Sequence, residues 1–106
     1  MEDRTERVAS FIKELSAEFL SREDNRTSLI TVTSASCSPD LRRATIFISV
    51  LPEEKENEAL AFARRKRGEL RDILKENMNT KNIPFLEIEL DRGEKNRQKI
   101  DELLHQ

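Results

Sequence analysis

The residues best suited to chemistry form a basic cluster around a glycine. Six bases lie close together in the chain: Arg64, Arg65, Lys66, Arg67, Arg71 and Lys75. Only Glu69 and Asp72 are acidic among them, so six bases against two acids leave a local charge of +4 in a chain of net charge −2. Gly68 would let the backbone approach an anion closely, and a helix that begins there offers free N–H groups. This combination is typical of phosphate binding.

The same cluster also has an ordinary structural explanation. Bases late in a helix that begins with glutamates complement the helix macrodipole. Glu69 and Asp72 could pair with some of the bases, and most charge runs are simply solvated faces. The phosphate hypothesis is favoured because excess positive charge, a glycine and a helix start coincide in a chain that is acidic as a whole.

The periodicity around the cluster conflicts with one continuous helix. At ~100° per residue, a helix over residues 59–78 would place Lys66 and Arg67 inside its apolar stripe and Gly68 well off it. Two unpaired buried cations would cost several kcal/mol, and glycine inside a helix costs about 1 kcal/mol more. We therefore predict a kink or break within residues 65–69, with this turn exposed to solvent.

The first half of the chain changes from a helical to a strand pattern. Apolar residues spaced i, i+3, i+4 predict a helix over about residues 5–20. β-Branched residues then predict a strand over about residues 29–36. Turn residues follow at 38–41, and an alternating pattern resumes to residue 51. Two strands joined by so short a turn make an antiparallel hairpin.

The second half adds helices and one more strand. Pro52 ends the hairpin, and the glutamates after it suit the start of a helix whose pattern continues to about residue 79. Alternation over residues 81–90 predicts a third strand, and the apolar residues of 100–104 predict a short last helix. We expect one domain over residues 1–106, because this length supports a single modest core.

Composition argues against several other classes of protein. No apolar run could span a membrane, and the N-terminus lacks the apolar core of a signal peptide. Cys37 is the only cysteine, so we expect no internal disulfide and a reducing compartment. The only histidine, His105, is next to the last residue, where it makes a poor general base. With no Cys/His cluster and no Gly-rich nucleotide loop, we expect no enzyme, no metal and no cofactor.

The whole chain also resembles the bacterial ribosome-binding factor A family. The similarity runs from RVASFIKELSAEFL at residues 7–20 to IDELL at residues 100–104. Its most specific part is LITVTSASCSPDLRRATIFISVLPEE at residues 29–54, where the family carries a similar VTVT, S-x-DL and A-x-V-x-VSV pattern. The family's Ala-x-Gly kink between two helices reads Lys66-Arg67-Gly68 here, so the glycine is kept and the alanine is not.

This resemblance implies an α+β fold of KH type II, a three-stranded sheet with helices mainly on one face, in the order α-β-β-α(kink)α-β-α. It implies a non-enzymatic, cytoplasmic monomer that binds free small (30S) ribosomal subunits and 16S rRNA near the rRNA 5′-terminal helix. Such a factor would assist late subunit maturation and processing of 16S rRNA. The expected RNA-binding residues are the cluster and three outlying bases: Arg64, Arg65, Lys66, Arg67, Gly68, Arg71, Lys75, Arg42, Arg43 and Lys81.

The alternative is a KH-like adaptor that binds a protein, without direct RNA binding. Its open sheet face and acidic surface would form the contact, and the net negative charge favours this hypothesis. Salt-dependent RNA binding would separate the two hypotheses, because phosphate contacts release counterions and protein-only binding does not.

Overall fold

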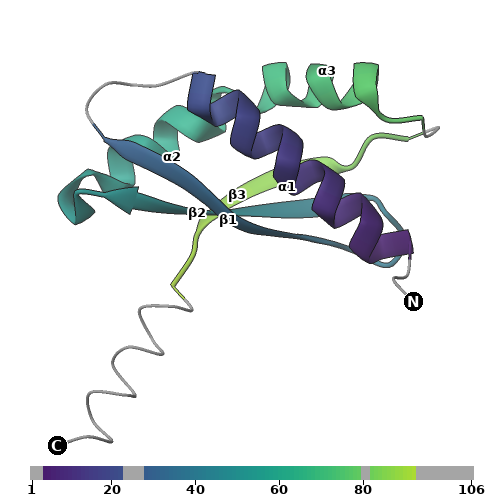
Figure 1. Ribbon diagram of the computed structural model, residues 1–106, viewed down its shortest axis with the longest axis horizontal. Coiled ribbons are helices and arrows are strands. Elements are labelled where there is room, and N and C mark those ends of the chain that lie inside the picture. The colour runs from purple at the N-terminus through teal and green to yellow at the C-terminus, as the bar shows by residue number, and fades with distance from the viewer. Residues whose placement is uncertain (1–3, 23–27, 80–81, 93–106) are drawn as a thin grey trace, which may run out of the picture.

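The computed structural model describes residues 4–22, 28–79 and 82–92. Its elements, in chain order, are α1 (Arg4–Arg22), β1 (Leu29–Cys37), β2 (Arg43–Leu51), the short 3₁₀ helix η1 (Glu53–Lys55), α2 (Glu56–Arg65), α3 (Arg67–Asn77) and β3 (Phe85–Leu90) (Figure 1). The predicted α+β order is confirmed as far as β3. The predicted last helix, which contains Ile100, Leu103 and Leu104, lies outside the described residues.

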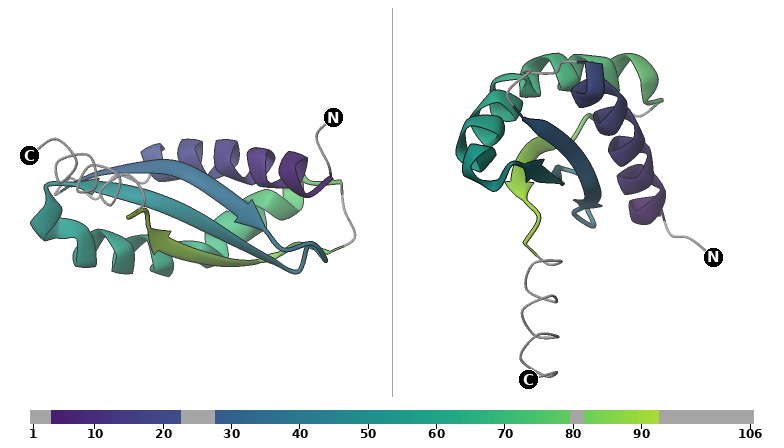
Figure 2. Two further views of the ribbon diagram at one scale, coloured as in Figure 1. Left: turned by 90° about the horizontal axis from the view of Figure 1, so that it is seen from below. Right: turned by 60° about the vertical axis from the view of Figure 1, so that its left-hand side comes forward.

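The three strands form one mixed sheet in the order β1-β2-β3. β1 and β2 pair antiparallel as the predicted hairpin, whereas β3 lies parallel to β2. A parallel pair needs a long crossover, and α2 and α3 supply it. The α-helices of the described chain all lie on one face of the sheet, and no described element covers the other face (Figures 1 and 2).

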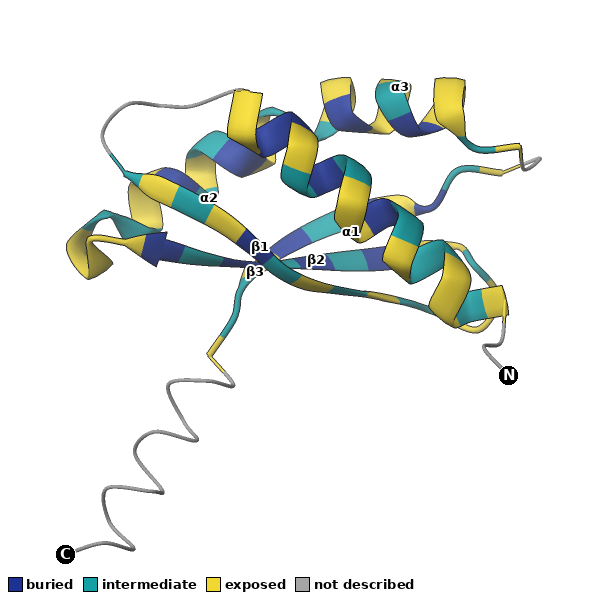
Figure 3. Ribbon diagram, viewed as in Figure 1, coloured by how far each residue is buried: buried dark blue, intermediate teal, exposed yellow. Residues whose placement is uncertain are grey.

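Side-chain alternation in the strands decides which face carries the helices. In β2 every second residue is buried, from Ala44 to Val50, and the residues between them are half-buried. β3 repeats the pattern with Leu86 and Ile88 buried, as predicted. The buried stripes of the helices face the sheet in Figure 3. The core therefore lies between the sheet and the helices, and residues from every strand and α-helix fill it.

The hairpin turn uses the side chains that the sequence predicted. The Leu41 N–H donates to the Ser38 carbonyl at 2.9 Å. Asp40 Oδ1 accepts from Ser38 Oγ at 2.6 Å and from the Arg42 N–H at 3.1 Å. The Ser38 bond, with the Arg42 bond after it, holds the pKa of the Asp40 carboxyl below its usual value. The turn is therefore fixed by local polar contacts rather than by burial.

One residue of β1 breaks the regular register of the hairpin. Val32 pairs with Ile48 and Ser34 with Phe47, so Thr33 between them is a β-bulge. Thr33 Oγ1 donates to Asp91 Oδ2 at 2.5 Å and lies 3.2 Å from the Phe47 carbonyl. The bulge thus connects the first strand to the residue that follows the last strand.

No α-helix in the described ranges is long and apolar enough to cross a membrane.

Candidate nucleic-acid interface

A single residue, Lys66, separates α2 from α3. Its backbone angles lie in the bridge region between helix and strand. The Lys66 N–H donates to the Ala63 carbonyl at 3.1 Å, and the Leu70 N–H donates to the Lys66 carbonyl at 3.0 Å. The predicted break within residues 65–69 is confirmed. Each helix buries its own apolar residues: Ala59, Ala63, Leu70 and Leu74.

The first base of the cluster, Arg64, is bonded to the sheet. Its Nε and Nη2 donate to the Ile88 carbonyl at 3.3 and 3.1 Å, and Nη2 lies 3.4 Å from Glu89 Oε1. β3 is an edge of the described sheet, so this arginine bonds a strand that has a partner on one side only. Arg64 therefore fixes the end of α2 against β3. Its predicted role as an RNA ligand stays a prediction.

The prediction that the turn is exposed to solvent is wrong for Lys66 and Arg67, which are both half-buried. Lys66 Nζ lies 3.6 Å from Glu69 Oε1 and 5.8 Å from the centre of the Phe62 ring. Arg67 Nε donates to the Arg64 carbonyl at 3.2 Å, and its guanidinium carbon lies 6.0 Å from the centre of the Phe85 ring. The side chains cover apolar surface while their charged ends stay within reach of water and partners.

Three bases and the glycine remain on the surface. Arg65, Arg71 and Lys75 are exposed and make no hydrogen bond or ion pair with the described part of the chain. Gly68 is exposed too, and its spacing with Arg71 and Lys75 places all three along one side of α3. Asp72 is exposed next to them and offsets part of the charge. Arg65 is the last residue of α2, just before the break at Lys66. We call Arg65, together with Gly68, Arg71 and Lys75, the α3 stripe.

The fold itself does not require glycine at position 68. Its φ is not positive, and a Cβ added there meets no other atom within 4 Å. An alanine would fit without strain and would favour the helix, since glycine in a helix costs up to about 1 kcal/mol relative to alanine. The residue therefore leaves bare backbone at the surface, on the side of α3 that also carries Arg71 and Lys75.

The outlying bases do not join the stripe. Arg42 and Arg43 are exposed at the hairpin turn. Arg42 lines a surface hollow together with Arg4 and Met78, so it lies near the end of α3 that is away from Lys66. Lys81 is outside the described residues. Arg4 and Arg7 also lie near Met78, and the sequence gives no local signal of this, because it depends on how α1 packs.

Cys37 has the environment of a structural cysteine. It is half-buried at the end of β1. Burial raises the pKa of its thiol, and the nearby Asp40 carboxylate raises that pKa further. The reactive thiolate is therefore disfavoured. His105 lies outside the described residues.

The chain is similar over nearly its whole length to proteins of one family. The family model described as Ribosome-binding factor A matches residues 4–104. A ribosome-binding factor A of Thermomicrobium roseum is 33% identical over 106 residues, which cover 97% of this chain and 82% of that protein.

Known structures of this family share the fold. The crystal structure of ribosome-binding factor A from Thermus thermophilus has a TM-score of 0.71 at 25% identity, and the match covers 82% of this chain and 96% of that one. A homology model of the Thermus thermophilus factor, fitted into the cryo-EM map of a 30S–ribosome-binding factor A complex, has a TM-score of 0.68 at 23% identity and covers 78% and 90%. With a family match from residue 4 to residue 104 and a relative at one-third identity, this chain belongs to the ribosome-binding factor A family.

Proposed function

We propose that the protein binds the small (30S) ribosomal subunit and contacts its RNA through the α3 stripe. Family membership supports the partner, as does the likeness in fold to the Thermus thermophilus factor placed in a 30S complex. The observation that carries the contact surface is the stripe itself. The stripe contains three exposed cations that have no partner in the described chain. It also contains a glycine that the fold does not need.

The stripe suits phosphate groups better than base edges. Arg65, Arg71 and Lys75 would pair with phosphates, and the open backbone at Gly68 would let an RNA strand come close to the first turn of α3. Contacts of this kind fix position and carry no sequence information. The protein would thus act by holding RNA in one arrangement, and no bond would be made or broken.

The bonded bases would give the surface its shape. Arg64 holds the end of α2 on β3, and Arg67 bonds the last turn of α2 from the first turn of α3. These contacts fix the angle between α2 and α3 at Lys66, so the stripe has its binding geometry before RNA arrives. An RNA contact then loses less entropy than it would on a flexible loop.

Family membership supports the finer role that the resemblance implied. In that role the protein assists late maturation of the 30S subunit and processing of 16S rRNA, by binding near the rRNA 5′-terminal helix, as a non-enzymatic cytoplasmic monomer. Binding would favour one rRNA conformation over its alternatives, which requires only that the protein has different affinities for the two.

One observation favours the protein adaptor as a second candidate. Leu29 and Leu51 are paired across β1 and β2, and they are 63% and 65% exposed. Phe85 is 56% exposed on β3. Contiguous exposed apolar patches often mark protein contacts, and the Leu29–Leu51 pair is the start of such a patch. Such an adaptor would bind without a dependence on salt of the kind that phosphates cause.

Binding of purified 30S subunits at several salt concentrations tests the proposal. Arg71→Glu should weaken binding and lower the slope of log K against log[salt] by about 0.7 or more, because at least one phosphate contact is lost. Lys13→Glu makes the same charge change on an exposed position of α1 and should change binding little. Equal binding by wild type and Arg71→Glu at low salt would show that the stripe is only a solvated helix face.

A further inference from the structure

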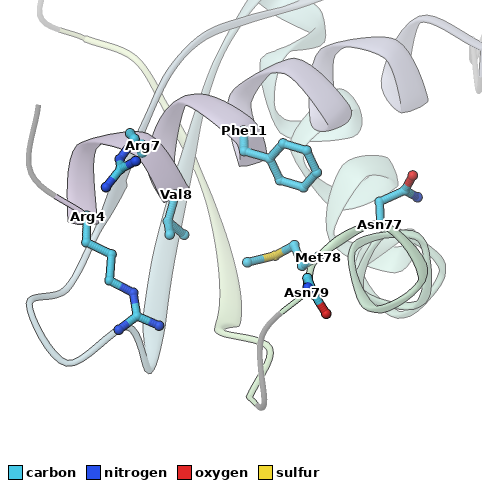
Figure 4. A pocket seen from close by; sticks show the side chains of 7 residues that line it. All are labelled: Arg4, Arg7, Val8, Phe11, Asn77, Met78 and Asn79. Carbon is cyan, nitrogen blue, oxygen red and sulfur yellow. The ribbon is translucent and has the colours of Figure 1, made fainter.

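A second surface feature lies at the end of α3 that is away from Lys66. It is an open hollow of about 400 Å³ between the first turns of α1 and the residues after α3. Val8 and Phe11 from α1 and Met78 line it, and Figure 4 shows the Phe11 ring and the Met78 side chain entering it from these two elements. All three residues are half-buried, so they offer apolar surface while remaining accessible.

The rim of the hollow is polar and positively charged. Arg4 and Arg7 line it and form no hydrogen bond or ion pair with any described residue. Asn77 and Asn79 add two amide side chains. Asn77 Nδ2 donates to the Ile73 carbonyl at 2.7 Å. The amide oxygen of Asn77 is left as an acceptor.

The positive charge continues into a neighbouring hollow of about 320 Å³. That hollow shares Arg4, Val8 and Met78 with the first and adds Arg42. Asp40 is the acid in its lining, and its carboxylate already accepts bonds from the hairpin turn. Arg4 and Arg7 in the first hollow and Arg42 in the second thus bring three arginines to the neighbourhood of Val8 and Met78.

We propose that the first hollow binds one unpaired RNA nucleotide. The base would lie against Phe11, Met78 and Val8, because aromatic and thioether groups make favourable contacts with the flat face of a base. The amide of Asn79, below Met78 in Figure 4, would bond the base edge, and Arg4 and Arg7 would bind the flanking phosphates. The volume of the hollow falls within the usual range of about 300 to 1,000 Å³ for sites that take small organic groups.

The chemistry of the hollow favours a nucleotide over an acidic peptide. A bound peptide usually needs either an open strand edge for its main chain or a groove for several side chains in a row. The hollow is bounded by the start of α1 and the end of α3, so it offers no strand edge. It does offer a small apolar floor beside two arginines without partners in the described chain, which matches one base and its phosphates.

This site is separate from the α3 stripe. The helix α3 contains 11 residues. At ~1.5 Å per residue its length is about 16 Å. The stripe runs along this helix from its Lys66 end to Lys75, whereas the hollow is lined by Asn77, Met78 and Asn79 at the other end, so the two share no residue. A single strand of RNA held at both places would run along the helix. The inference extends the proposed function, and base recognition in the hollow can be measured independently of phosphate binding by the stripe.

The test uses the full chain and two short RNA probes that differ in one base. One probe is an abasic ribose-phosphate chain with a single central adenine, and the other is abasic throughout. In a titration followed by NMR, the methyl groups of Val8 and Met78 should shift with the first probe. The first probe should also bind about tenfold more tightly than the second, a factor within the range measured for one stacked base.

Two variants and their controls locate the contact. Phe11→Leu keeps an apolar side chain but removes the ring, so the tenfold preference should fall to about twofold or less. Phe62→Leu makes the same change in α2, away from the hollow, and should keep the preference. Arg7→Glu should weaken both probes, whereas Lys13→Glu should weaken neither. If circular dichroism shows that Phe11→Leu is unfolded, the methyl shifts and the adenine preference of the wild type decide whether a base enters the hollow. Arg7→Glu, at an exposed residue, then tests the phosphate contacts.

Several outcomes would overturn the inference. Equal affinity for the two probes, or methyl groups that do not shift, would mean that no base enters the hollow. Shifts of the same methyl groups by a polyglutamate peptide at lower concentration than by RNA would assign the site to an acidic protein segment. The two sites can fail separately: a wild-type salt slope in Arg71→Glu refutes the stripe, whereas a missing preference for adenine refutes the hollow.

Discussion

Replacing Gly68 by alanine should raise stability and weaken RNA binding in the same protein. The substitution adds one methyl group on the surface of the first turn of α3, where it meets no atom within 4 Å. Because the backbone there is helical and φ is not positive, the alanine introduces no strain. It also reduces the conformational freedom of the unfolded chain. Every intramolecular consequence is therefore favourable.

The size of both effects follows from that geometry. We expect the free energy of unfolding to rise by about 0.5 kcal/mol, since the site is in the first turn rather than the middle of a helix. For a domain of this size the melting temperature should rise by about 2 to 4 °C. Binding to 30S subunits should weaken about tenfold if a phosphate bonds the backbone here, which corresponds to about 1.4 kcal/mol and is close to the value of one hydrogen bond to a charged partner.

Thermal unfolding and subunit binding, measured on the same preparation, check the prediction. Ala61→Gly is a suitable control, because Ala61 is exposed on α2 and the change should lower stability without affecting binding. If Gly68→Ala is more stable and binds as tightly as wild type, close approach of a phosphate to this backbone is refuted. If it is less stable, the inference of open space at position 68 is wrong.

Three further predictions concern residues outside that position. Arg64→Ala should lower the free energy of unfolding by about 1 kcal/mol in urea denaturation, because the Ile88 carbonyl loses its bonded arginine. Arg65→Ala should change the free energy of unfolding by about 0.5 kcal/mol at most and should instead lower the salt slope of RNA binding. Equal losses of stability in Arg64→Ala and Arg65→Ala would contradict the bonded role of Arg64. Iodoacetamide should alkylate Cys37 more slowly in the folded protein than in urea at pH 8, since burial and Asp40 raise the thiol pKa. Asp40→Asn should speed the folded reaction, and equal folded and unfolded rates in wild type would count against this account. Ser16→Ala should leave stability unchanged or raise it by about 0.5 to 1 kcal/mol, because burial of an unbonded hydroxyl is unfavourable. The Ser16 hydroxyl is fully buried without a hydrogen-bond partner among the described residues. If urea denaturation shows that Ser16→Ala is clearly less stable than wild type, the hydroxyl is bonded in solution.

The break at Lys66 could be predicted because it depends on residues close together in sequence. The angular positions of Lys66, Arg67 and Gly68 on a helix are fixed by their spacing, and a conflict with the apolar stripe is visible in the sequence alone. The hairpin was predictable for the same reason, since its turn is built from Ser38 and Asp40 within a few residues.

The contacts of the basic residues could not be predicted in this way. Arg64 bonds Ile88, which is 24 residues away, and Arg67 lies against Phe85. Both partners come from β3, whose position depends on the parallel crossover. A cation that looks solvated in sequence can therefore be half-buried, provided that its stem packs and its charged end finds a partner. Of the predicted cluster, the fold left Arg65, Arg71 and Lys75 without partners in the described chain.

The hollow near Met78 shows a related limit of the sequence. Arg4 and Met78 are far apart in the chain, and the packing of α1 beside α3 brings them together. Neither residue has neighbours in sequence that indicate a site. The hydrogen bond of the Thr33 hydroxyl could not be predicted for a similar reason, because its partner Asp91 follows β3.

The parallel pairing of β3 with β2 also sets the order in which a newly made chain can complete this surface. Synthesis proceeds from the N-terminus, so α1, the hairpin and both helices of the crossover leave the ribosome before β3 does. The Arg64 bond to Ile88 forms only after residue 88 has emerged. A chain cut short before β3 would carry every base of the α3 stripe without the strand that fixes the angle at Lys66. The proposed RNA-binding surface therefore takes its final shape only after translation has passed β3.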